Sequence, residues 1–202
     1  MNTITIHTLP KIGTAMPGGF FAGAIMLNGQ RFAIIQPSKK LGELSGAWHE
    51  DEVDVPGAKS YNDGLANTLA MAEAGSELAK LVLDLTIDGL SDFYIPSQDE
   101  AELCYRAFKP STKQNWCYAR SGINLSAVPP TYPYTPEFPV QTTLDSFKQG
   151  GDEAFEQEAY WTSTQHAGYS DNAWCQDFDD GNQLNGFKSC ELRVRPVRRQ
   201  PI

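Results

Sequence analysis

The sequence of 202 residues predicts an α+β fold in one domain that spans residues 1–202. Three observations predict it: a hairpin signal near the start, helical patterns in the middle, and short alternating segments near the end. No internal repeat is visible, and no linker divides the chain. Strands followed by helices and then by further strands are typical of an α+β domain.

An N-terminal hairpin is the first predicted element. Two apolar runs, FFAGAIML and RFAIIQP, are separated by Asn28, Gly29 and Gln30. Asn and Gly both tolerate positive φ, and an Asn-Gly break between such runs favours a tight hairpin turn. The polar segment that follows, residues 42–57, is expected to be a loop.

The first of two main helices is expected to begin at Ser60, because the sequence SYND resembles a capping box. Its helical spacing is carried by Leu65, Leu69 and Ala72. Gly75 and Ser76 interrupt the pattern, and residues 76–85 add a separate turn or two.

The second main helix is expected to begin after Ser97, which is followed by Glu100 at capping-box spacing and preceded by Pro96. Four of its residues follow helical spacing and predict one buried stripe: Ala101, Cys104, Tyr105 and Phe108.

A proline-rich loop insertion is expected over residues 110–150, which show little periodicity. The stretch 128–139 holds five prolines, which fix φ and remove hydrogen-bond donors. Its aromatic side chains, Tyr132, Tyr134 and Phe138, form either a contact surface or a layer lying flat on the domain.

C-terminal antiparallel strands are expected at residues 160–164, 172–178, 183–189 and 192–198, with a hairpin turn at 179–182. Trp174, Gln176 and Phe178 share one face of their strand, and Cys175 and Asp177 share the other. The bulky aromatics Trp161, Trp174 and Phe178 are assigned to the core.

The charge balance bears on the class of partner. The net charge of −9 argues against nucleic acid and against anionic membrane surfaces. The one basic cluster is expected to be the solvent side of a final strand rather than a phosphate site; it comprises Arg193, Arg195, Arg198 and Arg199.

Neither a membrane-spanning run nor a signal peptide is recognised, so we expect the chain to fold in a cytoplasm. The cysteines are then expected to be thiols, with Cys104 filling the core: Cys104, Cys117, Cys175 and Cys190.

Catalytic and metal-binding patterns are sparse. The histidines His7, His49 and His166 are too scattered for a metal triad, and spacing gives no support to a nucleophile pair of Cys175 with His166. We therefore expect neither enzymatic activity nor a cofactor. Calcium is the alternative, because it binds several oxygen ligands. Such ligands could come from Asp171, Asn172, Asp177, Asp179 or Asp180. Adjacent aspartates in a turn, however, more simply accept hydrogen bonds from local backbone N–H groups.

The stretch YWTSTQHAGYSDNAWCQDFDDGNQ, residues 160–183, combines aromatic, hydroxyl and amide groups around two breaks. Such groups suit the recognition of carbohydrate or protein surfaces. The candidate contact residues flank the two turns: Tyr169, Asp171, Asn172, Asn182, Gln183 and Asn185. The alternative for each is an ordinary polar loop residue.

A family resemblance joins several of these segments. LSDFYIPSQDEAELCY resembles the pattern sDWYLPSkdEL..LY, and YWTST followed by DNAWCQDFDDGNQ, FKS and RVRPVR resembles YWSST, nAW...F..G, K and VR.VR. Together these segments resemble the DUF1566 (Lcl C-terminal-like) family, a branch of the C-type lectin fold found in bacterial adhesins and many phage genes. The resemblance runs from about Pro17 to Arg199 and is weakest over residues 110–150.

The resemblance implies a single C-type-lectin-like domain with its termini paired in one sheet and with a looped region that carries the binding face. It implies ligand binding rather than catalysis. The calcium motif of animal C-type lectins is absent from this sequence, so calcium-dependent sugar recognition is not implied.

The expected function is therefore that of a non-catalytic phage virion protein. It would be a tail-tip, fibre or baseplate subunit that binds a host cell surface. The alternatives are a structural virion subunit, such as a head decoration or tail-assembly part, and a bacterial adhesin domain. Expected partners are other virion proteins, a host surface glycan or protein, and further copies of the chain, without nucleic acid or membrane insertion. The expected location is the virion, assembled in the host cytoplasm.

Overall fold

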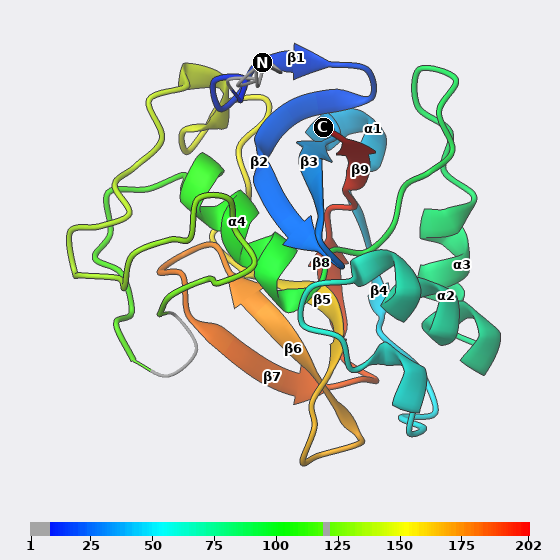
Figure 1. Cartoon of the computed structure of the whole chain (residues 1–202). Helices are drawn as coiled ribbons and strands as arrows, with labels where there is room; N and C mark the ends of the chain where they lie inside the picture. Colours follow the sequence, from blue (N-terminus) through cyan, green and yellow to red (C-terminus); the bar gives the residue numbers. More distant parts are fainter. Residues whose placement is uncertain (1–8, 119–121) are drawn as a thin grey trace.

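The computed structural model describes residues 9–118 and 122–202 and has mixed α+β content with two sheets (Figure 1). The four-stranded sheet has the order β1 (Ala15–Met16), β2 (Gly19–Leu27), β3 (Gln30–Gln36) and β9 (Arg198–Pro201). The five-stranded sheet has the order β4 (Leu44–Ala47), β8 (Glu191–Val194), β5 (Ala159–Gln165), β6 (Asn172–Asp177) and β7 (Gln183–Phe187). Only β5 and β8 pair in parallel among these strands. The expected α+β class is confirmed at this level.

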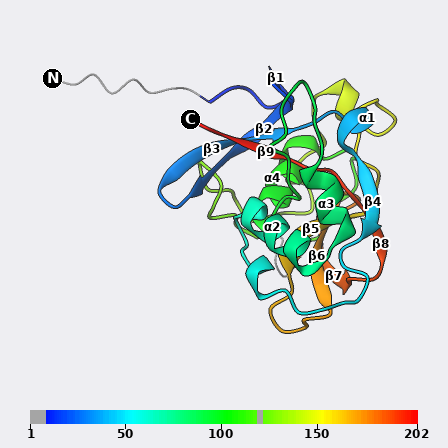
Figure 2. The same cartoon turned by 90° about the vertical axis from the view of Figure 1, so that its right-hand side faces the viewer.

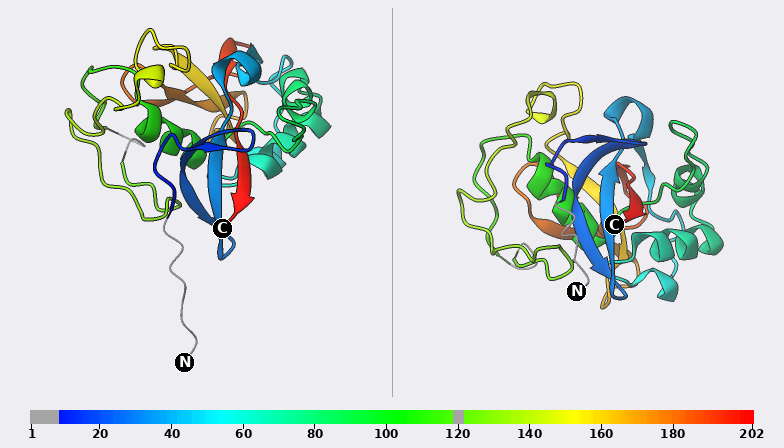
Figure 3. Two further views of the ribbon diagram at one scale, coloured as in Figure 1. Left: turned by 90° about the horizontal axis from the view of Figure 1, so that it is seen from above. Right: turned by 45° about the horizontal axis from the view of Figure 1, so that its top comes forward.

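The predicted N-terminal hairpin is confirmed. Asn28 and Gly29 both take positive φ, 49° and 79°, and join β2 to β3. Strand β9 pairs antiparallel with β3, so segments near the two ends of the chain lie side by side in one sheet (Figures 2 and 3).

The described residues contain four α-helices rather than two main ones: α1 (Lys39–Gly42), α2 (Gly64–Ala74), α3 (Glu77–Leu83) and α4 (Gln98–Phe108). Two short 3₁₀ turns, η1 (Pro56–Ala58) and η2 (Asp145–Phe147), complete the helical elements there.

Helix α2 starts later than predicted. Asp63 is its N-cap and accepts the backbone N–H of Ala66, whereas Ser60 accepts the N–H of Asp63 and shapes the preceding turn. The predicted interruption is confirmed, because Gly75 ends α2 with a φ of 111° and Ser76 caps α3.

The buried face of α2 also differs from the prediction. Leu69 is 53% exposed, whereas Asn67 and Thr68 are buried. Asn67 donates to hydroxyls of Ser163 and Thr164 on β5. The helix thus turns its polar side inward, because the strand beneath it carries hydroxyl groups.

Helix α4 matches its prediction closely. Ser97 and Glu100 form a complete capping box, and the whole predicted stripe is buried. The carboxylate of Glu100 also accepts the backbone N–H of Gly64 and the hydroxyl of Tyr94, which ties the start of α2 to α4. Because α4 packs against β2 of one sheet and against β5 and β6 of the other, it joins the two sheets (Figure 1).

The predicted loop at 42–57 is wrong in part, because it contains β4, which pairs with β8 near the other end of the chain, as Leu44 does with Val194. Trp48, directly after β4, is fully buried and donates from Nε1 to the carbonyl of Thr162. No local pattern in the sequence indicates this long-range pairing.

The prediction of one solvent-facing final strand is also wrong. Its residues divide between β8 and β9, and Arg195 and Arg198 are buried. Each arginine of the cluster is neutralised by a carboxylate: Arg193 and Arg195 by Glu43, Arg198 by Asp92 and Arg199 by Asp63.

In the described part of residues 110–144 there is no helix and no strand of either sheet. Tyr134 is buried there, as expected for a side chain that lies on the domain. Tyr132 and Phe138 are 74% and 44% exposed, and a contact role for these two stays a prediction. The side chain of Asn115 is buried and donates to the carbonyls of Thr135 and Pro139, which fixes the loop.

All four cysteines are free thiols, as predicted, and Cys104 is buried in the core. Across residues 9–118 and 122–202, no helix is long and apolar enough to cross a membrane.

Candidate ligand-binding surface

Three cross-strand pairs form a strip of amide and aromatic side chains on one face of β6 and β7. We call this the β6–β7 strip. Its pairs are Asn172 with Phe187, Trp174 with Asn185, and Gln176 with Gln183. Residues directly opposite each other in an antiparallel pair point to the same face, so the six side chains form one continuous row of pairs.

Exposure along the strip falls from its outer to its inner end. Phe187 is 55% exposed, Trp174 and Asn185 are half-buried, and Gln183 is 4% exposed. The outer amides are held by a hydrogen bond of 2.7 Å from Nδ2 of Asn172 to Oδ1 of Asn185. The outer end is therefore the part of the strip that a partner can reach.

The inner end of the strip is a closed amide network beneath α4. Gln183 donates from Nε2 to Oε1 of Gln176 at 3.0 Å and to the carbonyl of Gln98 at 2.9 Å. Gln98 donates in return to Oε1 of Gln183 at 3.1 Å. These bonds fix β7 against the start of α4, so they hold the strip rigid.

An aromatic stack rises from the strip into the turn between β5 and β6. The ring of His166 lies between Tyr169 and Trp174, with both centroid distances at 4.8 Å. Nδ1 of His166 accepts the backbone N–H groups of Gly168 and Tyr169, which shapes the turn. Tyr169, at the end of the stack, is 61% exposed.

Two polar atoms beside the strip have no hydrogen-bond partner among the described residues. They are Nε1 of Trp174, a donor, and Oε1 of Gln98, an acceptor. Buried polar groups are normally paired, so these two atoms are exceptions, and both are inaccessible to solvent.

The structure brings together four of the six predicted contact residues. Tyr169 and Asp171 lie in the β5–β6 turn, and Asn172 and Asn185 lie at the outer end of the strip. Gln183 is buried in the amide network, so it is not a surface contact. Asn182 lies in the β6–β7 turn at the opposite end of β6.

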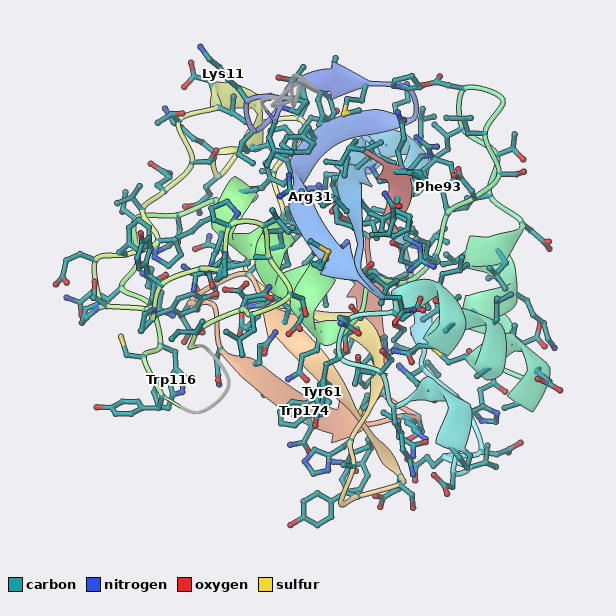
Figure 4. The ribbon with its side chains drawn as sticks, in the orientation of Figure 1. Lys11, Arg31, Tyr61, Phe93, Trp116 and Trp174 are labelled. Carbon is teal, nitrogen blue, oxygen red and sulfur yellow. The ribbon has the colours of Figure 1, made fainter. Side chains whose placement is uncertain are left out.

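Sequence reasoning missed His166 and Phe187 as parts of this surface, and it placed Trp174 in the core. Trp174 is in fact half-buried and lies toward the edge of the molecule in Figure 4, whereas Trp161 and Phe178 are core residues as predicted. The period-two placing of amide and aromatic residues along β6 and β7 could have found Trp174 and Phe187. His166 lies in the β5–β6 turn, where no such pattern indicates it.

The carboxylates considered for calcium lie at two separate places. Asp171 is in the β5–β6 turn, whereas Asp177, Asp179 and Asp180 surround the β6–β7 turn. Asp177 and Asp180 accept backbone N–H groups of their own turn, and Asp179 pairs with Lys113. Over the described ranges there is no group of three or more His, Cys, Asp and Glu residues placed to hold a metal ion.

The thiol of Cys175 and the ring of His166 do not form a pair. Cys175 packs with Trp161 on one face of β6, whereas His166 stacks on Trp174, whose side chain is on the other face. Burial raises the pKa of the Cys175 thiol, which disfavours the nucleophilic thiolate.

Fold and site together define a mixed α+β domain with an amide and aromatic surface at one end of its larger sheet. Comparisons with protein-family models, with curated proteins and with solved structures find no match.

Proposed function

We propose that this chain is a non-catalytic binding domain with a C-type-lectin-like fold. Its binding face is the outer end of the β6–β7 strip together with the β5–β6 turn. The observation that carries the proposal is the stack of Tyr169, His166 and Trp174 beside the bonded pair of Asn172 and Asn185. Aromatic faces with fixed amides suit sugar rings and polar protein surfaces.

The biological role that we propose is attachment of a phage virion to its host, through a tail-tip, fibre or baseplate subunit. The resemblance to the DUF1566 family supports this role. The pairing of β3 with β9 agrees with the expected meeting of the chain ends and supports the proposed fold only. A host surface glycan or protein is the proposed ligand.

Binding of the fluorescently labelled protein to candidate host cells tests this proposal. We expect Phe187→Ala and Trp174→Ala to reduce cell binding by about tenfold or more, because each removes a contact worth at least about 1.4 kcal/mol. Leu81→Ala is the matched control, since Leu81 is 56% exposed and Phe187 is 55% exposed. Equal binding by all three variants, or no binding by wild type in any assembled form, contradicts the proposal.

A second candidate, a structural virion subunit that uses the fold for protein contacts, is favoured by a different observation. Large apolar side chains that do not belong to the strip, such as Tyr118 and Leu125, are 69% and 79% exposed. Electron microscopy of labelled virions separates the two roles: a position on the capsid wall supports the second role and excludes tail-tip attachment. A bacterial adhesin domain is the remaining alternative, which the same labelling on bacterial cells would reveal.

A further inference from the structure

Strand β7 forms an open edge of the five-stranded sheet. It is the last strand in the sheet order, and β6 is its one partner strand among the described residues. Figure 1 shows β7 at the border of the sheet, with β6 on its inner side. The edge of a sheet carries backbone N–H and C=O groups without a ladder partner, so natural proteins usually cover or blunt such edges.

Two hydrogen bonds fix which backbone groups of β7 face β6. At one end the N–H of Lys188 donates to the carbonyl of Asp171, and at the other the N–H of Asp177 donates to the carbonyl of Asn182. The register between these bonds is unbroken. Only every second residue of an antiparallel strand exchanges hydrogen bonds with a given neighbour. The even-numbered residues of β7, Leu184 and Gly186, therefore bond to β6.

The odd-numbered residues of β7 present their backbone groups to the outer edge. Gln183 is buried, Asn185 is half-buried and Phe187 is 55% exposed. The carbonyl of Phe187 accepts the N–H of Cys190. The open part of the edge thus consists of the N–H and C=O of Asn185 and the N–H of Phe187. Within residues 9–118 and 122–202, no group pairs with these three.

The other three sheet edges are protected in ways that are common in proteins. Strand β1 has only two residues, and α3 packs against β4. Strand β9 ends in Pro201 and carries the charged side chains of Arg198 and Arg199. Proline and charge are the usual sequence devices against edge pairing, and β7, with the sequence QLNGF, contains neither. Its edge is thus open to pairing.

We propose that the outer edge of β7 binds an extended segment of a partner protein, which joins the sheet as a further strand. Asn185 offers a donor and an acceptor at the spacing that an opposite strand residue requires, and Phe187 offers a second donor. Neither a glycan nor a helix carries a matching row of backbone groups, so the edge selects an extended polypeptide. The inference uses the edge of β7 rather than its face, so it does not rest on the proposed function.

Charge indicates the kind of segment that this edge favours. The chain has a net charge of −9, and Asp171 and Asp180 lie in the turns at the two ends of β6. Lys188, directly after β7, turns its ammonium group inward to Val53 and Gln165. The surroundings of the edge are therefore acidic. A segment with basic residues on both sides of an apolar centre has the complementary charge.

Amide hydrogen exchange of the full chain tests the proposal, with the synthetic peptide acetyl-KTVTVTVK-amide as the probe. In the free chain, Asn185 and Phe187 should exchange about 100-fold faster than Leu184 and Gly186, because only the latter two bond to β6. We expect the peptide to bind with a dissociation constant on the order of 1 mM. At saturation it should slow exchange at the two outward amides by about tenfold. The peptide with glutamate in place of lysine should bind about fivefold more weakly at low salt.

Two variants at one position isolate the backbone contribution. Asn185→Pro and Asn185→Ala both remove the side-chain amide, but only proline removes the outward N–H. Proline is tolerated on an edge strand where the missing N–H faces away from the neighbour. The proline variant should bind the peptide about fivefold more weakly than the alanine variant, because it lacks one backbone donor. The exchange measurement uses wild type, so it decides the question even where the proline variant does not fold.

Three results would overturn the proposal. Slow exchange of Asn185 and Phe187 in the free chain would mean that the edge is already covered, and loss of that protection on dilution would identify a second copy as the cover. Unchanged exchange at these amides with saturating peptide would show that the edge does not pair. Equal binding of the lysine and glutamate peptides would exclude a basic segment as the partner. Cell binding is measured separately, so failure of the proposed function leaves the peptide result intact.

Discussion

Arg195 donates from Nη2 to Oε2 of Glu43 at 2.6 Å, in an ion pair that is almost completely removed from water. Arg195 lies between β8 and β9, and Glu43 lies directly before β4. The guanidinium also donates to the carbonyls of Glu153 and Ala154 and lies 3.9 Å from the ring centroid of Phe155. One side chain thus joins three distant segments at the boundary of the two sheets.

Removal of either partner of this pair is expected to destabilise the fold strongly. Arg195→Met or Glu43→Gln should lower the free energy of unfolding by about 3–5 kcal/mol, because the remaining charge stays buried without its partner. Chemical denaturation measures this change. In contrast, Lys80→Ala, which breaks the exposed pair with Glu77, should cost less than about 1 kcal/mol. Equal costs for the two pairs would mean that Arg195 is solvated.

The loop segment is expected to depend on Asn115. Its Oδ1 accepts from the hydroxyl of Tyr105 and from Nζ of Lys109, while its Nδ2 donates to backbone carbonyls. Asn115→Asp replaces those donors with an oxygen that faces carbonyl oxygens, so we expect a loss of about 2–4 kcal/mol. Gln114→Ala, at the exposed neighbouring position, should change stability by less than about 0.5 kcal/mol. Thermal denaturation of both variants tests whether Asn115 is central to the stability of the loop segment. Equal losses for the two variants would show that it is not.

The two tryptophans of the C-terminal strands should behave differently. Trp161 is fully buried and donates to the carbonyl of Gly46, so Trp161→Ala should cost about 3–5 kcal/mol. Trp174 as a core residue would cost the same, but part of its side chain is exposed, so we expect a smaller loss. Denaturation curves of the two variants test this difference, and equal losses would place Trp174 in the core.

The turn that carries Tyr169 should depend on one acceptor atom. His166→Phe keeps an aromatic ring in the stack but removes the acceptor for the N–H groups of Gly168 and Tyr169. His166→Asn keeps an acceptor and loses the ring. Amide hydrogen exchange at Gly168 and Tyr169 should accelerate in the Phe variant by about tenfold or more, and much less in the Asn variant, since one hydrogen bond is worth about 1 kcal/mol or more. The opposite order would show that stacking, rather than the acceptor, shapes the turn.

Stability should rise with pH in the alkaline range because of Lys188. Burial lowers the pKa of its ammonium group to about 8, from an ordinary value of 10.5. Its Nζ donates to the carbonyl of Val53 and to Gln165, and it lies 4.4 Å from the ring centroid of Trp48. Between these two pKa values the unfolded chain binds more protons than the folded chain, so the free energy of unfolding increases with pH across that window.

Comparison of wild type with Lys188→Met at about pH 7 and about pH 10 isolates this contribution, since every other titrating group is common to both. Wild type should gain stability relative to the variant at the higher pH. Lys80→Met, at an exposed lysine paired with Glu77, is the matched control. A relative gain at the lower pH would mean that Lys188 is stabilised as the charged form.

Elements whose signals are local were predictable. The Asn28-Gly29 turn, the interruption at Gly75 and the capping box of Ser97 with Glu100 each depend on residues a few positions apart. Part of the candidate surface, namely Tyr169, Asn172 and Asn185, was predictable for the same reason, because its turn and its two strands are contiguous in sequence.

Elements whose partners lie far away were not predictable. Strand β4 is specified by β8, and the burial of Arg195 is specified by Glu43, 152 positions away. The exposure of Leu69 follows from the hydroxyl groups of β5 rather than from any feature of α2 itself. Similarly, the amide of Gln183 is a surface group by sequence and is buried only because the start of α4, at Gln98, lies above it.

The division of the last residues between two sheets has a consequence for synthesis. Strand β8 lies between β4 and β5, and β9 completes the other sheet beside β3. A nascent chain can form its early hairpin and its helices on the ribosome, but neither sheet has all of its strands until residues 191–201 emerge. Cooperative folding is thereby delayed until nearly all of these residues have been translated, and a premature stop after residue 190 leaves both sheets incomplete at once.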